Sequence, residues 1–208
     1  MSTEAQDRRL LAVCSMLLAY PDRSTLDRLP LVREHLEELP ASARGPLSAV
    51  LDWLDRVPLI AAQEHYVEIF DRRRKACLYL TYFLNGDTRG RGMALVGFQQ
   101  AYQEVGFTVA GGELPDFLPV VLEFGAVGDL GVGLELLGRH RAGLELLHHA
   151  LSGFGSPYAD VVDALLPAVP TGIAGPTAEA LAASGPPTEM VGLTPFVPVD
   201  SLRVGART

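Results

Sequence analysis

The sequence has little of what several protein classes require. Its 208 residues include only two cysteines, and Cys14 and Cys77 each lie inside an apolar run, which indicates buried thiols rather than a disulfide framework or a metal site. No apolar run approaches the roughly 18–20 residues that span a bilayer. The first residues lack the charged, apolar and cleavage regions of a secretory signal. These absences lead us to expect a cytoplasmic protein without direct membrane insertion.

Positive charge is also scarce. The chain carries 17 lysine and arginine residues against 25 aspartate and glutamate residues, and Lys75 is its single lysine. The formal net charge of −8 disfavours nucleic acid as a partner, because binding a phosphate backbone needs a basic surface. The phosphate-binding pattern G-x-x-x-x-G-K-[ST] is absent, and Gly90, Gly92 and Gly97 do not fit G-x-G-x-x-G. We therefore expect no nucleotide cofactor.

Patterns for catalysis and metal binding are weak. Adjacent His148 and His149 would point in different directions on a helix, and no other residue completes a metal-ligand spacing with them. Acidic residues could supply a carboxylate pair for acid–base work, but helix capping and ion pairing with neighbouring arginines explain such residues more often. The acidic candidates are Asp71, Asp87, Glu113 and Asp116. We expect neither a metal nor catalytic activity, and keep an enzyme as the less favoured alternative.

Apolar residues at helical spacing are abundant. Apolar residues at all positions together make up 48% of the sequence. This share could reflect a thick core or an apolar groove for a partner, and we favour the core. No segment alternates apolar and polar residues with a period of two. We predict an all-α fold, a single-domain bundle of about eight helices within residues 1–166. Proline and glycine then crowd together, which predicts a flexible tail over residues 167–208, where residues 196–199 could dock back in extended form.

Proline, glycine and aspartate place the predicted helix ends. One helix should open near Pro46, since proline suits a first turn, and Gly106 should end another in a left-handed conformation. Asp116 has the position of an N-cap for the helix that follows it. The leucines of residues 130–151 predict one helix, and Ser156 introduces the last one.

Three segments combine charged, aromatic and apolar side chains at predicted helix ends. They are residues 66–72 (YVEIFDR), residues 86–93 (GDTRGRGM) and residues 113–119 (ELPDFLP). The basic run at residues 72–75, together with Arg89 and Arg91, could bind an anion or an acidic partner. It could equally be a solvated face with internal ion pairs, and the sequence leaves both open.

Taken together, these segments resemble the NarJ family, the nitrate reductase delta subunits, which are molybdenum cofactor assembly chaperones within the wider group of redox-enzyme maturation proteins. Residues 17–22 (LLAYPD) resemble the end of the family's opening helix, and Tyr158-Ala159 with the following apolar helix resembles its last core helix. The resemblance covers about residues 10–166, in order. Each motif is weak alone, and the set is specific.

The resemblance implies an all-helical chaperone without enzymatic activity. Its partner would be the catalytic (alpha) subunit of respiratory nitrate reductase, bound through its N-terminal segment in the cytoplasm and kept competent for molybdenum cofactor insertion and membrane docking. The family's peptide groove would fall here on Tyr66, Glu68, Phe70, Asp71, Asp87, Arg89, Arg91, Glu113, Asp116, Phe117 and Leu118. A chaperone for another molybdoenzyme, or a helical scaffold without a groove, are the alternatives.

The residue types agree with this expectation. A helical client would lay its apolar face against Tyr66, Phe70, Phe117 and Leu118, while charges at the rim set its orientation. We expect Asp116 to cap its own helix and to present charge to the groove.

Overall fold

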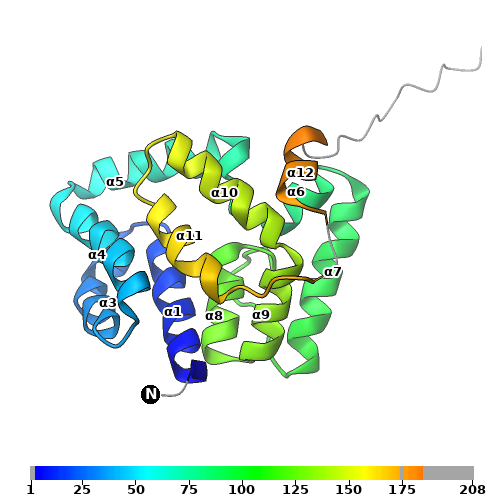
Figure 1. Cartoon of the computed structure of the whole chain (residues 1–208), viewed down its shortest axis with the longest axis horizontal. Helices are drawn as coiled ribbons and strands as arrows, with labels where there is room; N and C mark the ends of the chain where they lie inside the picture. The colour runs from blue at the N-terminus through cyan, green and yellow to red at the C-terminus, as the bar shows by residue number, and fades with distance from the viewer. Residues whose placement is uncertain (1–2, 174–175, 185–208) are drawn as a thin grey trace, which may run out of the picture.

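The computed structural model describes residues 3–173 and 176–184, and it confirms the all-α prediction (Figure 1). These residues form twelve α-helices and three short π or 3-10 segments, and their β pairing is limited to one isolated bridge between Tyr79 and Phe117. The helices are α1 (Thr3–Leu18), α2 (Arg23–Asp27), α3 (Leu29–Leu36), α4 (Ala41–Arg56), α5 (Leu59–Tyr66), α6 (Leu80–Asn85), α7 (Arg89–Glu104), α8 (Leu118–Val127), α9 (Leu130–Arg139), α10 (Arg141–Gly153), α11 (Ala159–Leu165) and α12 (Ala178–Ser184). The short segments are the π-helical η1 (Val67–Asp71) and the 3-10 turns η2 (Arg74–Ala76) and η3 (Leu166–Ala168).

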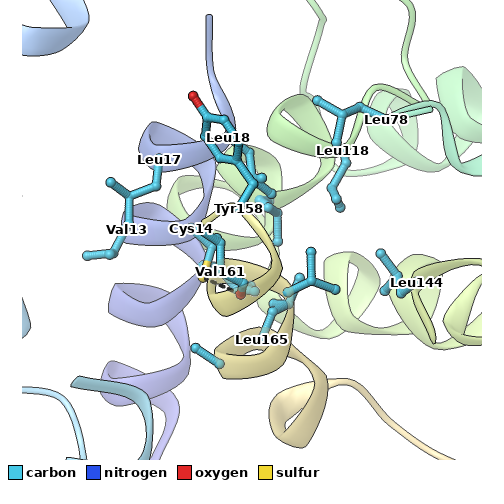
Figure 2. Close-up of a cluster of buried hydrophobic side chains, with 14 of the residues drawn as sticks. Val13, Cys14, Leu17, Leu18, Leu78, Leu118, Leu144, Tyr158, Val161 and Leu165 are labelled. Carbon is cyan, nitrogen blue, oxygen red and sulfur yellow. Dashed lines mark hydrogen bonds between the residues drawn. The ribbon is translucent and has the colours of Figure 1, made fainter. Parts of the chain in front are cut away.

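The core is built around α1, which packs against α8 and α11, while α11 also packs against α4 (Figure 1). Figure 2 shows Cys14 of α1 beside Val161 of α11, with Leu165 below them and Tyr158 above. All these side chains are almost completely buried, and each buried aliphatic one contributes about 1.5–3 kcal/mol. The Cys14 thiol lies 3.9 Å from the Val161 carbonyl oxygen, and burial raises its pKa. The prediction of a buried thiol is confirmed for Cys14, whereas Cys77 is only partly buried.

The chain forms more helices than the sequence predicts, and one reason is that residues 130–151 are not one helix. They divide into α9 and α10 at His140, whose Nδ1 lies 2.9 Å from the Leu136 carbonyl oxygen. Leu137 and Leu144 lie on either side of the break and are both fully buried. The leucine spacing therefore continues across a change of direction that it does not reveal.

Two predicted helix boundaries are also wrong. The helix α4 begins at Ala41, so Pro46 lies inside it rather than in its first turn. The helix introduced by Ser156 is α11, but it is not the last, because α12 follows it. The left-handed conformation predicted for Gly106 is confirmed, with φ of 76°.

The segment after α11 makes contacts with the helical body. Val169 is only 2% exposed, and the Arg141 guanidinium donates hydrogen bonds to the carbonyl oxygens of Leu166 and Val169, at 2.8 and 2.6 Å. Further on, α12 packs against α10 and buries Leu181. The domain boundary at residue 166 stays a prediction, and the predicted docking of residues 196–199 lies outside the described residues.

Comparing two truncations should measure the contribution of this segment. A chain that ends at Pro170 keeps Val169 and both acceptors of Arg141, whereas a chain that ends at Leu166 loses Val169 and one acceptor. We expect both chains to fold, with the shorter one less stable by about 2 kcal/mol, the value of one buried valine. For a chain of this size that is about 4–8 °C in melting temperature, measurable by circular dichroism. Equal melting temperatures would show that Val169 adds nothing to the core.

Candidate functional site

Several of the predicted site residues are core residues. Tyr66 is 5% exposed and Phe70 8%, and Leu118 is fully buried. The Tyr66 hydroxyl donates a 3.0 Å hydrogen bond to the Leu18 carbonyl oxygen, and its ring packs 4.6 Å from that of Phe70. In this conformation these side chains support the surface above them, and a partner could not touch them directly.

Other predicted residues gather around Tyr79, a residue that the sequence reasoning missed. The Tyr79 ring lies 5.3 Å from the Phe117 ring, and the Arg91 guanidinium lies over it, 5.4 Å from the ring centroid. Arg91 also forms an ion pair with Asp87 at 3.7 Å. Burial raises the pKa of the Tyr79 hydroxyl, and Glu113 is the next largest cause. We call Tyr79, Asp87, Arg91, Glu113 and Phe117 the Tyr79 surface.

The backbone explains why these residues meet. The chain before α6 and the chain before α8 run antiparallel for a few residues, with Tyr79 opposite Phe117. The Leu118 amide donates a 2.8 Å hydrogen bond to the Leu78 carbonyl oxygen, and the Leu80 amide donates one of 3.0 Å to the Asp116 carbonyl oxygen. Residues 76–84, which the sequence predicts as one buried apolar helix, instead include an extended stretch that places Tyr79 partly at the surface.

The prediction that Asp116 caps its own helix is wrong. Phe117 is the N-cap residue of α8, and no side chain caps that helix. Asp116 instead caps α6, because its Oδ2 accepts hydrogen bonds from the Thr81 amide at 3.1 Å and from the Thr81 hydroxyl at 2.6 Å. The side chain is fully buried, and its Oδ1 has no hydrogen-bond partner among the described residues. Asp116 therefore anchors the start of α6 directly behind the Tyr79 surface.

The first predicted segment forms a charged edge of its own. The arginines after η1 pair with Glu68 rather than with Asp71, since Arg73 lies 2.7 Å and Arg72 3.5 Å from the Glu68 carboxylate. Asp71 is exposed at the end of η1, and Arg89 is exposed in the first turn of α7. Burial is the main cause that raises the pKa of the Tyr66 hydroxyl, which hydrogen-bonds inside the body. Asp71 of the first segment and Glu113 of the third both raise this pKa further, so both carboxylates lie near enough to Tyr66 to affect its hydroxyl.

The described residues offer no group of three or more histidine, cysteine, aspartate or glutamate side chains placed to hold a metal ion. Among the helices of the same residues, none combines the length and the apolar character that crossing a bilayer requires. What the Tyr79 surface offers chemically is an aromatic pair between charges of both signs, which suits recognition of a polypeptide.

Comparison with known proteins matches residues 36–163 to the family described as nitrate reductase delta subunit. The nitrate reductase molybdenum cofactor assembly chaperone NarJ of Escherichia coli K12 is 32% identical over 166 residues, covering 78% of this chain and 70% of that protein. The nitrate reductase-like protein NarX of Mycobacterium tuberculosis is 39% identical over 151 residues, or 73% of this chain. The chain spans only 23% of the length of that mycobacterial relative.

The fold has a counterpart among solved structures. A crystal structure of an Archaeoglobus fulgidus protein assigned as a redox enzyme maturation protein superposes with a TM-score of 0.58. The superposition covers 77% of this chain and 91% of the other, at 24% sequence identity. At that identity the likeness establishes a shared helical fold and no more.

Proposed function

Because this chain belongs to the nitrate reductase delta subunit family, we propose that it is a system-specific chaperone for the maturation of respiratory nitrate reductase. In this proposal it binds the N-terminal segment of the catalytic subunit in the cytoplasm. It keeps that subunit competent for insertion of the molybdenum cofactor and for docking at the membrane. The chaperone itself carries out no catalysis and holds no cofactor.

The observation that supports this proposal best is the Tyr79 surface. Two of the three segments that resemble the family contribute side chains to it: Asp87 and Arg91 come from residues 86–93, and Glu113 and Phe117 from residues 113–119. Backbone hydrogen bonds between residues 78–80 and 116–118 place Tyr79 beside Phe117, under the Arg91 guanidinium. An amphipathic helix binds such a surface by laying apolar side chains on the aromatic rings. Charges of both signs at the rim then fix its direction and reject wrong partners.

Burial divides the predicted site residues into two roles. Those with accessible side chains would contact the client, and they are Glu68, Asp71, Asp87, Arg89, Arg91, Glu113 and Phe117. The buried ones would hold these in place, and they are Tyr66, Phe70, Asp116 and Leu118.

Titration with a peptide tests the proposal. We expect a synthetic peptide that copies the N-terminal segment of the catalytic subunit to bind saturably with a negative heat-capacity change, since apolar surface is buried. Phe117→Ala should weaken binding at least about tenfold, as expected for an aromatic residue at the centre of an interface. Isothermal titration calorimetry at several temperatures measures both quantities.

A matched pair of charge variants serves as the control. Glu113→Gln removes a charge from the Tyr79 surface, whereas Glu34→Gln removes one from an exposed position on α3, at the other end of the molecule (Figure 1). The first should weaken client binding and the second should leave it unchanged. If the native chain showed no saturable binding, a helical scaffold would be favoured instead. If the two variants had equal effects, the client would not bind at the Tyr79 surface.

A further inference from the structure

A hollow lies beside the Tyr79 surface and shares only Asp87 with it. Its volume is about 650 Å³, and η2, α6, α10 and α12 form its walls. In Figure 1 these helices lie at the end of the molecule where α12 covers α6 and α10. The apolar side chains that line it are Tyr82, Phe83, Leu146, Ala150, Phe154 and Leu181.

The basic run that precedes the hollow divides into two halves with different roles. Arg72 and Arg73 both form ion pairs with Glu68, and the Arg73 guanidinium also lies 4.5 Å from the centroid of the Phe154 ring. Arg74 and Lys75 line the hollow, and neither forms an ion pair with a carboxylate of the described residues. The alternative of internal ion pairs therefore describes Arg72 and Arg73, and it leaves Arg74 and Lys75 for the alternative of anion binding.

The remaining polar lining adds no unpaired carboxylate from the described residues. His149 of α10 adds an imidazole to the lining. Asp87, the one acid among the described lining residues, lies 3.7 Å from Arg91. The chain as a whole has a net charge of −8 and so repels anions. Two cations without an ion-pair partner beside an apolar hollow would attract an anion to this one place.

We infer that this hollow binds a small amphiphilic anion, a molecule with an apolar aryl or acyl body and one carboxylate, sulfonate or phosphate group. The volume is within the range of about 300–1,000 Å³ that ligand pockets of proteins occupy. The apolar body would lie against Phe83, Leu146 and Phe154, and the anionic group would accept charge-assisted hydrogen bonds from Arg74 and Lys75.

The position of α12 favours a small molecule over a partner helix. Leu181 and Ala182 of α12 form one wall of the hollow, and α12 packs directly against α10. A partner helix could enter only by displacing α12, whereas a small molecule fits with α12 in place. This inference does not depend on the proposed chaperone function.

The aromatic sulfonate 1-anilinonaphthalene-8-sulfonate is a suitable probe, because its fluorescence rises in an apolar site. We expect the full chain in its folded state to bind one equivalent saturably. The double variant Arg74→Gln/Lys75→Gln should weaken that binding at least tenfold. The matched control Arg72→Gln removes a cation from the same run, outside the hollow, and should change the affinity less than twofold. Dodecanoate should displace the probe, and neutral dodecanol should not.

A steric variant tests the location. Gly153 lines the hollow, and a Cβ atom placed there would meet no atom within 4 Å, so a side chain can start at this position without a clash. We expect the leucine of Gly153→Leu to occupy part of the hollow. It should abolish binding of the probe while the melting temperature and the client-peptide affinity stay unchanged. Undiminished binding by Gly153→Leu or by Arg74→Gln/Lys75→Gln would overturn the inference. It would also be overturned if a soluble acidic peptide displaces the probe and dodecanoate does not, because the hollow would then be a peptide groove.

Discussion

Gly133→Ala is expected to unfold the protein at a markedly lower temperature. A Cβ atom at Gly133 of α9 would lie 2.6 Å from the Cα atom of Gly125 in α8 and 3.1 Å from its backbone nitrogen. Backbone atoms cannot rotate away as a side chain can, so the two helices would have to separate. Overpacking of this kind costs about 3 kcal/mol, which for a chain of this size is about 6–12 °C in melting temperature. Thermal denaturation followed by circular dichroism measures the shift.

The same substitution at Gly97 should have the opposite sign. Gly97 lies inside α7, and a Cβ atom there would meet nothing within 4 Å. Alanine is favoured over glycine in a helix interior by about 0.5–1 kcal/mol, so Gly97→Ala should raise the melting temperature slightly. If the two variants shifted the melting temperature alike, the close contact between α8 and α9 would not limit the packing of this protein.

The sequence predicted what local spacing determines. The buried face of α1 follows from Cys14 and the leucines three and four residues before and after it. The end of α7 follows from Gly106, because glycine adopts the left-handed conformation without strain. The break at His140 could not be predicted in this way. Leu137 before it and Leu144 after it are both buried, and what turns the chain there is how α9 and α10 pack on different neighbours.

The candidate site, too, could be predicted only where local sequence determines it. Its charged and aromatic segments could be recognised from the sequence, but Tyr79 lies inside an apolar run that looks like a buried helix. Its exposure depends on the antiparallel pairing of residues 78–80 with residues 116–118, which no local pattern predicts. The basic run shows a related limit: the i, i+4 spacing accounts for the ion pair of Arg72 with Glu68, but no spacing tells that Arg74 lines the hollow.

Asp116 is the residue for which local reasoning was most misleading. An aspartate just before an apolar helix is a common N-cap, yet its carboxylate binds the amide of Thr81, 35 residues earlier. Whether such a residue caps the next helix or an earlier one depends on how the chain folds back, and both arrangements have the same local sequence. The consequence is that one side chain ties the start of α6 to the start of α8.

Asp116→Ala should therefore destabilise the whole fold and not one helix end. It removes two hydrogen bonds to a charged acceptor and leaves the buried Thr81 amide and hydroxyl without a partner. Hydrogen bonds to charged groups contribute about 1.5–3 kcal/mol each, and the unpartnered Oδ1 offsets part of that gain. We expect a net loss of about 3–4 kcal/mol, or about 6–16 °C in melting temperature.

Asp116→Asn separates capping from charge. The amide oxygen can still accept from Thr81, so we expect a loss of about 1 kcal/mol, as for one neutral hydrogen bond. Thr81→Val is the matched control, because it removes the hydroxyl donor and keeps the backbone amide that Asp116 caps. If Asp116→Ala melted like the native chain, the carboxylate would not anchor α6.

Client binding of the asparagine variant tests the separate prediction that Asp116 contributes charge to the groove. Weaker binding by a stable variant would support that role, and equal binding would show that Asp116 acts on the Tyr79 surface only by holding α6 in place.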